Sequence, residues 1–186
     1  MCRTPSAGFS LIELLVTIAI VAILATIAFP SFESSIRSNR LATTSNEMLA
    51  SIALARGEAI KTKRTAGICG ADAAGSGCVG GTAWDNGWLV WSNSDSNVGY
   101  QQDADLLLRA VRPNEQLRLT VPASAGPPAR ENLLLFDARG RLMDQGGGNP
   151  RALSLRTSEC PTGQELVRTM TVNHVGQATL TRGSCS

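Results

Sequence analysis

The stretch from Phe9 to Phe29 constrains the fold of this chain more than any other. It contains 21 residues, which are apolar except for one serine, two threonines and one carboxylate, Glu13. At ~1.5 Å per residue, a helix of this length spans about 30 Å, the thickness of the hydrocarbon part of a bilayer. A carboxylate at that depth is costly if it stays unpaired, so such residues generally have a function and a partner. We expect residues 9–30 to form a transmembrane half-helix in which Glu13 makes a specific contact.

The helical signal continues beyond this stretch. Pro30 removes one backbone hydrogen bond and predicts a kink or a locally melted turn, which would end the membrane-embedded half. After it, apolar residues recur every three or four positions. We expect one helix of about 55 residues, whose amphipathic second half, residues 31–64, packs on a globular head. The expected stripe consists of Phe32, Ile36, Leu41, Met48, Ile52, Ala55 and Ala59.

Residues 65–186 differ in composition and predict a β-rich head. Short apolar runs alternate with turn-forming segments, a pattern typical of antiparallel strands. About 120 residues can bury one core, so we expect a single head domain and an α+β fold, with the long helix packed on an antiparallel sheet. In the strand at 87–92, Trp88 and Val90 should share one face. Leu89 and Trp91 should share the other. Further strands are expected at 106–111, 116–121, 132–136, 152–156, 166–172 and 176–181, and a loop at 70–81.

The cysteines favour disulfides over a metal site. One cysteine precedes the apolar stretch and four follow it, which allows three pairings of the four. Proximity in the sequence favours Cys69–Cys78, closing a Gly-rich loop, and Cys160–Cys185, tying down the C-terminal hairpin. No C-x-x-C motif occurs and His174 is the single histidine, so we expect no metal site. Disulfides indicate an oxidising compartment.

No catalytic or cofactor-binding pattern is present. The sequence has no G-x-S-x-G, Walker A or dinucleotide-binding fingerprint. Asp95, Asp103 and Asp105 do not follow the EF-hand pattern and should be solvated loop acids. We expect no enzyme activity and no cofactor. With 17 basic and 15 acidic side chains the chain is nearly neutral, which argues against general coating of nucleic acid.

The residues at the start of the apolar stretch carry a family resemblance. Gly8-Phe9-Ser10-Leu11-Ile12-Glu13, followed by an apolar helix, resembles the class III signal sequence of type IV pilins and type II secretion pseudopilins. The resemblance implies that a prepilin peptidase cuts between Gly8 and Phe9, removing residues 1–8, and that Phe9 is N-methylated. A secretory signal would instead be cut after its apolar segment. The resemblance also implies that Glu13 neutralises the N-terminal ammonium of a neighbouring subunit, and that Pro30 belongs to the assembly surface.

Three head segments resemble the GspH/FimT family. They are the tryptophan-containing strand at 84–91, the Gly turn at 136–141 and the C-terminal hairpin at 171–178. The resemblance implies a pilin-like fold and three alternative functions. The first is a structural minor pilin of a type IV pilus, present at low copy and helping to prime or cap assembly. The second is the H-type pseudopilin of the type II secretion system. The third is a DNA-binding minor pilin for natural transformation.

The disulfide-closed C-terminus and the Cys-bounded, Gly-rich loop favour the first alternative. For the third, family members with a basic C-terminal region suggest candidate DNA contacts at Arg139, Arg141, Arg168 and Arg182, although no dense arginine cluster occurs. The implied partners are other pilins or pseudopilins, the prepilin peptidase and the inner-membrane assembly platform. The chain would cross the inner membrane once, with its head in the periplasm, and then enter the pilus or pseudopilus.

Overall fold

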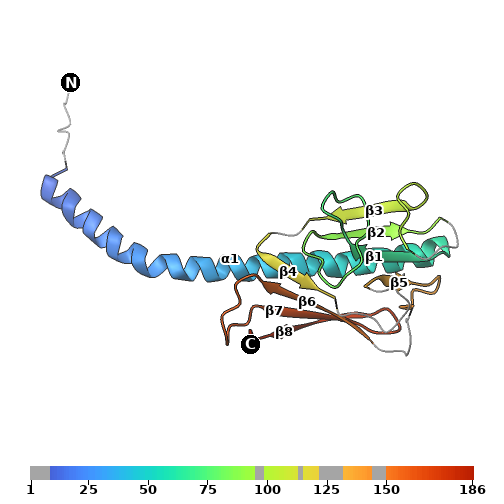
Figure 1. Ribbon diagram of the computed structural model, residues 1–186. Coiled ribbons are helices and arrows are strands. Elements are labelled where there is room, and N and C mark those ends of the chain that lie inside the picture. Colours follow the sequence, from blue (N-terminus) through green and yellow to red (C-terminus); the bar gives the residue numbers. More distant parts are fainter. Residues whose placement is uncertain (1–8, 95–98, 113–114, 122–131, 144–149) are drawn as a thin grey trace, which may run out of the picture. The chain divides into compact units, whose positions relative to one another are not determined.

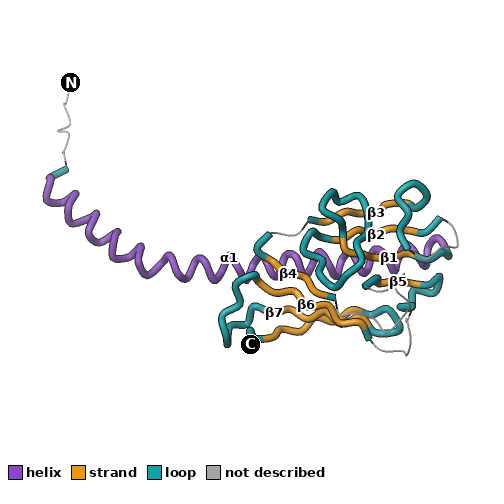
Figure 2. The backbone as a smooth tube through the Cα atoms, in the orientation of Figure 1, coloured by secondary structure: helices purple, strands orange, loops and turns teal. Residues whose placement is uncertain are grey.

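The computed structural model describes residues 9–94, 99–112, 115–121, 132–143 and 150–186, except for the side chains of residues 27–31. The described chain forms one long helix, α1, and eight β-strands (Figure 1, Figure 2). It divides into two compact units, Met1–Ser38 and Asn39–Ser186. The predicted leader, residues 1–8 with Gly8, lies outside the described residues.

Helix α1 runs from Leu11 to Thr62 and contains 52 residues, close to the length predicted from the sequence. It continues through Pro30 without a break. The φ angle of proline fits a helix and its ring removes one backbone bond only, so a long helix tolerates it. Lys63 follows the last helical residue with φ of 58°, the left-handed conformation that commonly terminates helices.

The strands form two antiparallel sheets of four. The first sheet has the order β3-β2-β1-β5 and the second the order β4-β6-β7-β8. The strands are β1 (Ala66–Gly70), β2 (Trp88–Ser92), β3 (Leu106–Val111), β4 (Leu117–Thr120), β5 (Leu134–Phe136), β6 (Arg151–Thr157), β7 (Val167–Val172) and β8 (Ala178–Gly183). The prediction of an α+β fold with one long helix and antiparallel strands is confirmed.

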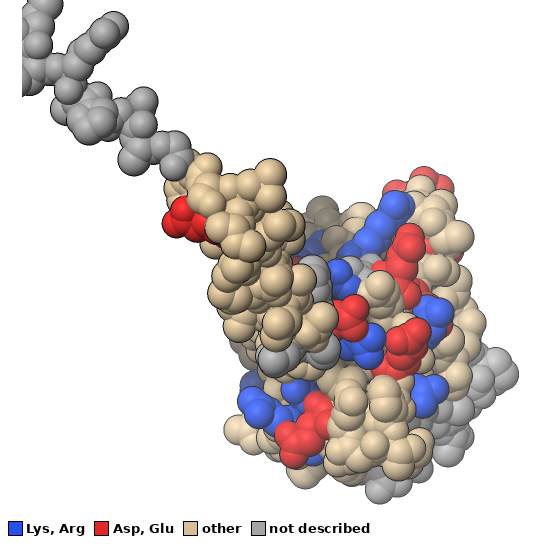
Figure 3. Space-filling model, turned by 90° about the vertical axis from the view of Figure 1, so that its left-hand side faces the viewer, with Lys and Arg blue, Asp and Glu red and all other residues tan. Residues whose placement is uncertain are grey.

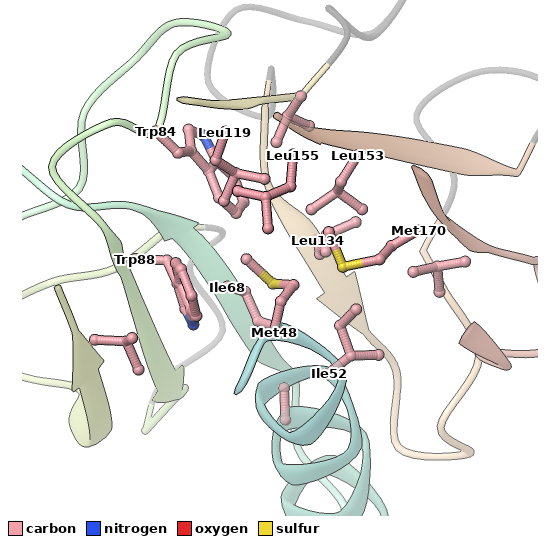
Figure 4. Close-up of a cluster of buried hydrophobic side chains, with 14 of the residues drawn as sticks. Met48, Ile52, Ile68, Trp84, Trp88, Leu119, Leu134, Leu153, Leu155 and Met170 are labelled. Atoms are coloured by element: carbon pink, nitrogen blue, oxygen red, sulfur yellow. The ribbon is translucent and has the colours of Figure 1, made fainter. Parts of the chain in front are cut away.

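The second half of α1 packs against both sheets in one core. Met48 and Ile52 point toward side chains of the first sheet, such as Trp88, and of the second, such as Met170 (Figure 4). The buried part of the predicted stripe consists of Leu41, Met48, Ile52, Ala55 and Ala59, each at most 2% exposed. Burying a side chain the size of Met or Ile stabilises the fold by about 1.5–3 kcal/mol. The core therefore fixes this half of α1 to the head.

A second, smaller cluster covers the other face of the first sheet. Leu89 and Trp91 of β2 pack there with Cys69 and Leu135, whereas Trp88 and Val90 face the main core. The predicted alternation of β2 is therefore present, with both faces buried. Residues 71–87 connect β1 to β2, and a bond between Cys69 and Cys78 ties the first part of this loop to β1.

β1 is a strand that the sequence analysis does not predict. Its sequence, AGICG, contains two glycines and is directly followed by the Gly-rich segment that we expected to be a loop. A Cβ atom on Gly67 would lie 2.7 Å from Cζ2 of Trp91, and one on Gly70 would lie 2.4 Å from Cδ1 of Trp84. The glycines thus make room for two indole rings, a packing requirement between residues far apart in the sequence.

Candidate functional site

The first described residues place Phe9 and Glu13 around the start of α1. Phe9 precedes the helix and is 79% exposed. The Leu14 N–H donates to the Ser10 carbonyl at 3.1 Å, and Glu13 lies in this first turn. The partial positive charge at a helix N-terminus favours a carboxylate there. In the part of the chain that the structure describes, no basic side chain forms an ion pair with Glu13.

Exposed hydrocarbon surrounds this carboxylate along the first unit. Between Phe9 and Leu24, eleven large apolar side chains are between 51% and 79% exposed: Phe9, Leu11, Ile12, Leu14, Leu15, Val16, Ile18, Ile20, Val21, Ile23 and Leu24. Nothing among the described residues qualifies as a helix that is long and apolar enough to cross a membrane. A surface with this much contiguous hydrocarbon marks a site of interaction with lipid or with another protein.

Two of the head segments that resemble the GspH/FimT family lie next to Arg56 of α1. The Gly140 turn follows β5, and the Gly176 turn joins β7 to β8. Arg56 Nε donates to the Gly140 carbonyl at 3.0 Å, and the Leu142 N–H donates to the His174 carbonyl at 3.1 Å. The sequence analysis assigned no role to Arg56. No local pattern identifies it, because its acceptor lies 84 residues away.

The four arginines considered for DNA contact lie in two places. Arg139 and Arg141 belong to the turn after β5, whereas Arg168 and Arg182 are cross-strand partners in β7 and β8. The second pair lies four residues along the hairpin from its turn end, a separation of about 13 Å at ~3.3 Å per residue. The structure therefore brings together Arg168 and Arg182 but does not join them to the other two.

Two of these arginines are already engaged within the head. Arg141 Nη2 lies 2.8 Å from Asp137 Oδ2. Arg168 is 6% exposed and donates to the carbonyls of Glu165 and Val167, both at 2.9 Å. Burial lowers the pKa of the Arg168 guanidinium and nearby Arg182 lowers it further, while Glu165 raises it. On the face shown in Figure 3, acidic and basic side chains are interspersed over the head and neither sign forms one large patch.

The structure contains two disulfides. Cys69–Cys78 connects β1 to the following loop, with the two cysteines nine residues apart in the sequence. Cys160–Cys185, with a separation of 25 residues, joins the segment after β6 to the segment after β8. The Cys185 N–H also donates to the Gln164 carbonyl at 2.9 Å. The second disulfide therefore ties the C-terminal segment to the connection between β6 and β7.

The carboxylates considered for metal binding have structural roles or lie apart. Asp105 is 9% exposed and accepts hydrogen bonds from the N–H groups of Ser94 and Gln101, so it orders the loop before β3. It is thus not the solvated loop acid that we expected. Asp95 lies outside the described residues. Within the described ranges no cluster of three or more histidine, cysteine or acidic side chains is arranged to hold a metal ion.

Comparison with known families accounts for the long helix and the head together. The family model described as type II transport protein GspH matches residues 44–176, which cover most of the head and the second half of α1. The chain belongs to the GspH family. A second model, the prokaryotic N-terminal methylation motif, matches residues 3–29 of this GspH-family protein. No curated protein sequence matches it significantly.

Solved structures show the same pilin-like fold. The type IV minor pilin FimU of Pseudomonas aeruginosa, in one crystal form, is 18% identical with a TM-score of 0.51, over 79% of this chain and 95% of FimU. A second crystal form is 17% identical with a TM-score of 0.50, over 77% of this chain and 97% of FimU. The minor pseudopilin EpsH of the Vibrio cholerae type 2 secretion system is 16% identical, with a TM-score of 0.49 over 77% of this chain and 97% of EpsH.

The predicted membership of the GspH/FimT group and the predicted pilin-like fold are therefore confirmed. The chain is a GspH-family protein, and the fold that it shares with the minor pilin FimU is the pilin-like fold. The methylation motif implies processing by a prepilin peptidase and assembly with other pilin-like subunits.

Proposed function

We propose that this GspH-family protein is a structural minor pilin of a type IV pilus, a low-copy subunit that helps to prime or cap the filament. Glu13 carries the proposal. It lies in the first helical turn, among exposed hydrocarbon, and it pairs with no basic side chain in the described part of its own chain. A carboxylate in this setting is stabilised by a cation from outside the chain.

The cation in this proposal is the N-terminal ammonium of a neighbouring subunit. Cleavage between Gly8 and Phe9 creates that ammonium, and N-methylation of Phe9 keeps its charge. Attraction between opposite charges grows as the dielectric constant falls, and each charge offsets the desolvation cost of the other. A helix array with apolar surfaces around the pair provides such a medium. Glu13 would thus set the axial position of one subunit against the next.

The remaining parts of the chain follow from this mechanism. Residues 9–30 hold the subunit in the inner membrane before assembly, residues 31–64 connect this anchor to the head, and residues 65–186 lie in the periplasm. The two disulfides support an oxidising compartment. The partners are other pilins through α1, including the surface around Pro30, together with the prepilin peptidase and the inner-membrane assembly platform.

The H-type pseudopilin of a type II secretion system is the second candidate. The description of the matching family model, type II transport protein GspH, favours it. The disulfide that closes the C-terminal segment and the Cys-bounded loop favour the pilus. DNA uptake is the third candidate, and the pairing of Arg168 with Arg182 is the observation in its favour.

Replacing Glu13 by leucine tests the proposal in a strain that lacks the chromosomal copy. The variant should still insert into the membrane, because the substitution removes a charge from an apolar segment. Piliation, scored by sheared-filament yield, should fall about tenfold or more if each neighbour loses its counter-ion. Glu33→Leu is the matched control, since Glu33 lies on the same helix and pairs with Arg37 at 3.6 Å.

The readouts separate the candidate machines. Loss of piliation with normal protein secretion supports the minor pilin, and loss of secretion with normal piliation assigns the chain to the secretion system. Normal piliation and secretion with Glu13→Leu as the sole copy would refute the role of Glu13 in both.

A further inference from the structure

Strand β8 is a regular sheet edge that the described chain leaves open. It pairs with β7 over six residues without a register shift. No strand or isolated bridge among the described residues pairs with its other side. Edge strands of this kind can pair with an additional strand, and proteins usually protect them by covering segments, bulges or charges.

Two of the other three sheet edges are covered, and the third, β3, is open in the described chain but irregularly paired. β4 is covered by the segment before Trp84, because the Trp84 N–H donates to the Leu119 carbonyl at 2.8 Å. β5 is covered by a short return segment, in which the Met143 N–H donates to the Leu135 carbonyl at 2.7 Å. The β2–β3 pairing is irregular between Val90 and Trp91. Among the described edges, β8 is therefore the one that is uncovered on its outer side and also paired without a register shift along its whole length.

The hydrogen-bond alternation shows which groups of β8 face outward. The Asn173 N–H donates to the Gln177 carbonyl at 2.9 Å, so these two residues form a hydrogen-bonded pair at the turn. In an antiparallel ladder such pairs alternate with non-bonded ones. The backbone groups of Thr179 and Thr181 are therefore directed to β7. Those of Ala178, Leu180 and Arg182 are directed outward.

A groove runs between this edge and α1. It has a volume of about 550 Å³ and is lined by Leu49, Ile52, Ala53 and Arg56 of the helix and by Gly176, Gln177, Ala178 and Thr179. Leu180 lies on the same face of β8 as Ala178 and is 39% exposed. A strand added beside β8 would place every second side chain over this groove, so small apolar side chains fit there.

The charge of Arg182 indicates which kind of residue should lie at one end of the added strand. Arg182 shares the face of Leu180 and Ala178, it is exposed, and its cross-strand partner is the buried Arg168. Arg182 and Glu165 both act electrostatically on the Arg168 guanidinium, so two guanidinium groups and one carboxylate lie near one another. An acidic residue opposite Arg182 would balance this excess. A nucleic acid requires several exposed cations along its backbone, whereas this edge offers one exposed arginine beside an apolar groove.

We propose that β8 is the docking edge for an extended, acidic segment of a partner protein, which adds a fifth strand to the second sheet. The segment runs antiparallel to β8, with an acidic residue opposite Arg182 and small apolar residues opposite Leu180 and Ala178. Backbone hydrogen bonds supply affinity, and the charge and groove supply specificity. This site lies on the head and does not depend on the role proposed for Glu13.

The test uses the full chain in detergent micelles and the peptide Thr-Asp-Thr-Val-Thr-Ala-Thr. Hydrogen exchange of individual amides is measured by NMR with and without saturating peptide. The amides of Leu180 and Arg182 should exchange rapidly without peptide and become protected by about tenfold or more when the peptide pairs with them. The amides of Thr179 and Thr181 should be protected in both states, because they face β7.

A charge exchange makes the test specific. Arg182→Glu should weaken peptide binding about tenfold, and a peptide with Lys in place of Asp should recover that loss. Arg109→Glu on the other open edge, β3, changes the net charge equally and should leave binding unaltered. Absence of protection at Leu180 and Arg182, or an equal loss with Arg109→Glu, would overturn the proposal. So would Arg182-dependent binding of duplex DNA without protection by the peptide, which would assign the edge to nucleic acid.

Discussion

Gly176 illustrates, at the scale of single residues, how tightly the head is fitted to its helix. Its φ of +78° belongs to the left-handed region, and a Cβ atom would lie 2.2 Å from the Gly140 carbonyl oxygen and 3.0 Å from Arg56 Nε. Moving this backbone oxygen aside would also disturb the hydrogen bond that the Gly140 carbonyl accepts from Arg56. The turn between β7 and β8 therefore requires glycine for two reasons, its conformation and its close contact.

We predict that Gly176→Ala lowers the free energy of unfolding by about 3 kcal/mol or more, since it combines the left-handed penalty with a backbone clash. Gly163→Ala is the control for conformation alone, because Gly163 has φ of +84° and nothing lies near its Cβ position. It should cost about 1–2 kcal/mol. Gly80→Ala, with open space and no positive φ, should be close to neutral. Denaturant unfolding of the three variants gives the comparison, and equal costs for Gly176→Ala and Gly163→Ala would contradict it.

Residue patterns predict some of these features and miss others. The alternation in 87–92 predicts the two faces of β2, since the signal lies within the strand itself. The glycines of β1 indicate a loop by local propensity. Glycine is needed at these positions because the side chains of Trp84 and Trp91, which are distant in the sequence, occupy the space of a Cβ atom. The Arg56 contact with Gly140 is equally non-local.

At the scale of elements, long periodic segments are predicted well and sheet topology is not. The sequence predicts one long helix and seven of the strands, because each has its own apolar period. It predicts neither the division into two sheets nor the covering of the β4 and β5 edges, which depend on pairing between separate segments. The same holds for the candidate sites. The sequence motif predicts the Glu13 segment, whereas the open edge of β8 can be recognised only once the order of the strands in the sheet is known.

The two disulfides should stabilise the head unequally. In the chain-entropy model, the loop closed by Cys160–Cys185 contributes about 3.5 kcal/mol and that closed by Cys69–Cys78 about 2.7 kcal/mol. Each disulfide is studied in a variant in which the other two cysteines are replaced by alanine. The free energy of unfolding of each variant is then compared before and after reduction, so that packing differences between the two variants cancel. We predict a larger loss on reduction for Cys160–Cys185, by about 1 kcal/mol. A larger loss for Cys69–Cys78 would show that its contacts with the Trp91 cluster outweigh loop length.

At the scale of the whole molecule, the chain combines two units with opposite surface character. The first, Met1–Ser38, exposes hydrocarbon around Glu13 in its described part, and the second, Asn39–Ser186, buries most of its large apolar side chains in a disulfide-bonded head. A head that folds around the second half of a helix leaves the first half available for other molecules. The proposed role as a filament subunit requires this property.

Mass spectrometry of the N-terminal peptide tests this account most directly. The protein is purified from a native membrane fraction of cells that contain prepilin peptidase, and the same protein from cells without the peptidase is the control. We predict a first residue of N-methylated Phe9, with residues 1–8 absent, and an uncleaved N-terminus in the control. A Gly8→Leu variant should remain uncleaved, since the peptidase site accepts small residues there. An N-terminus beyond Phe29, or an uncleaved chain in cells with active peptidase, would contradict the assignment of α1 as a retained pilin helix.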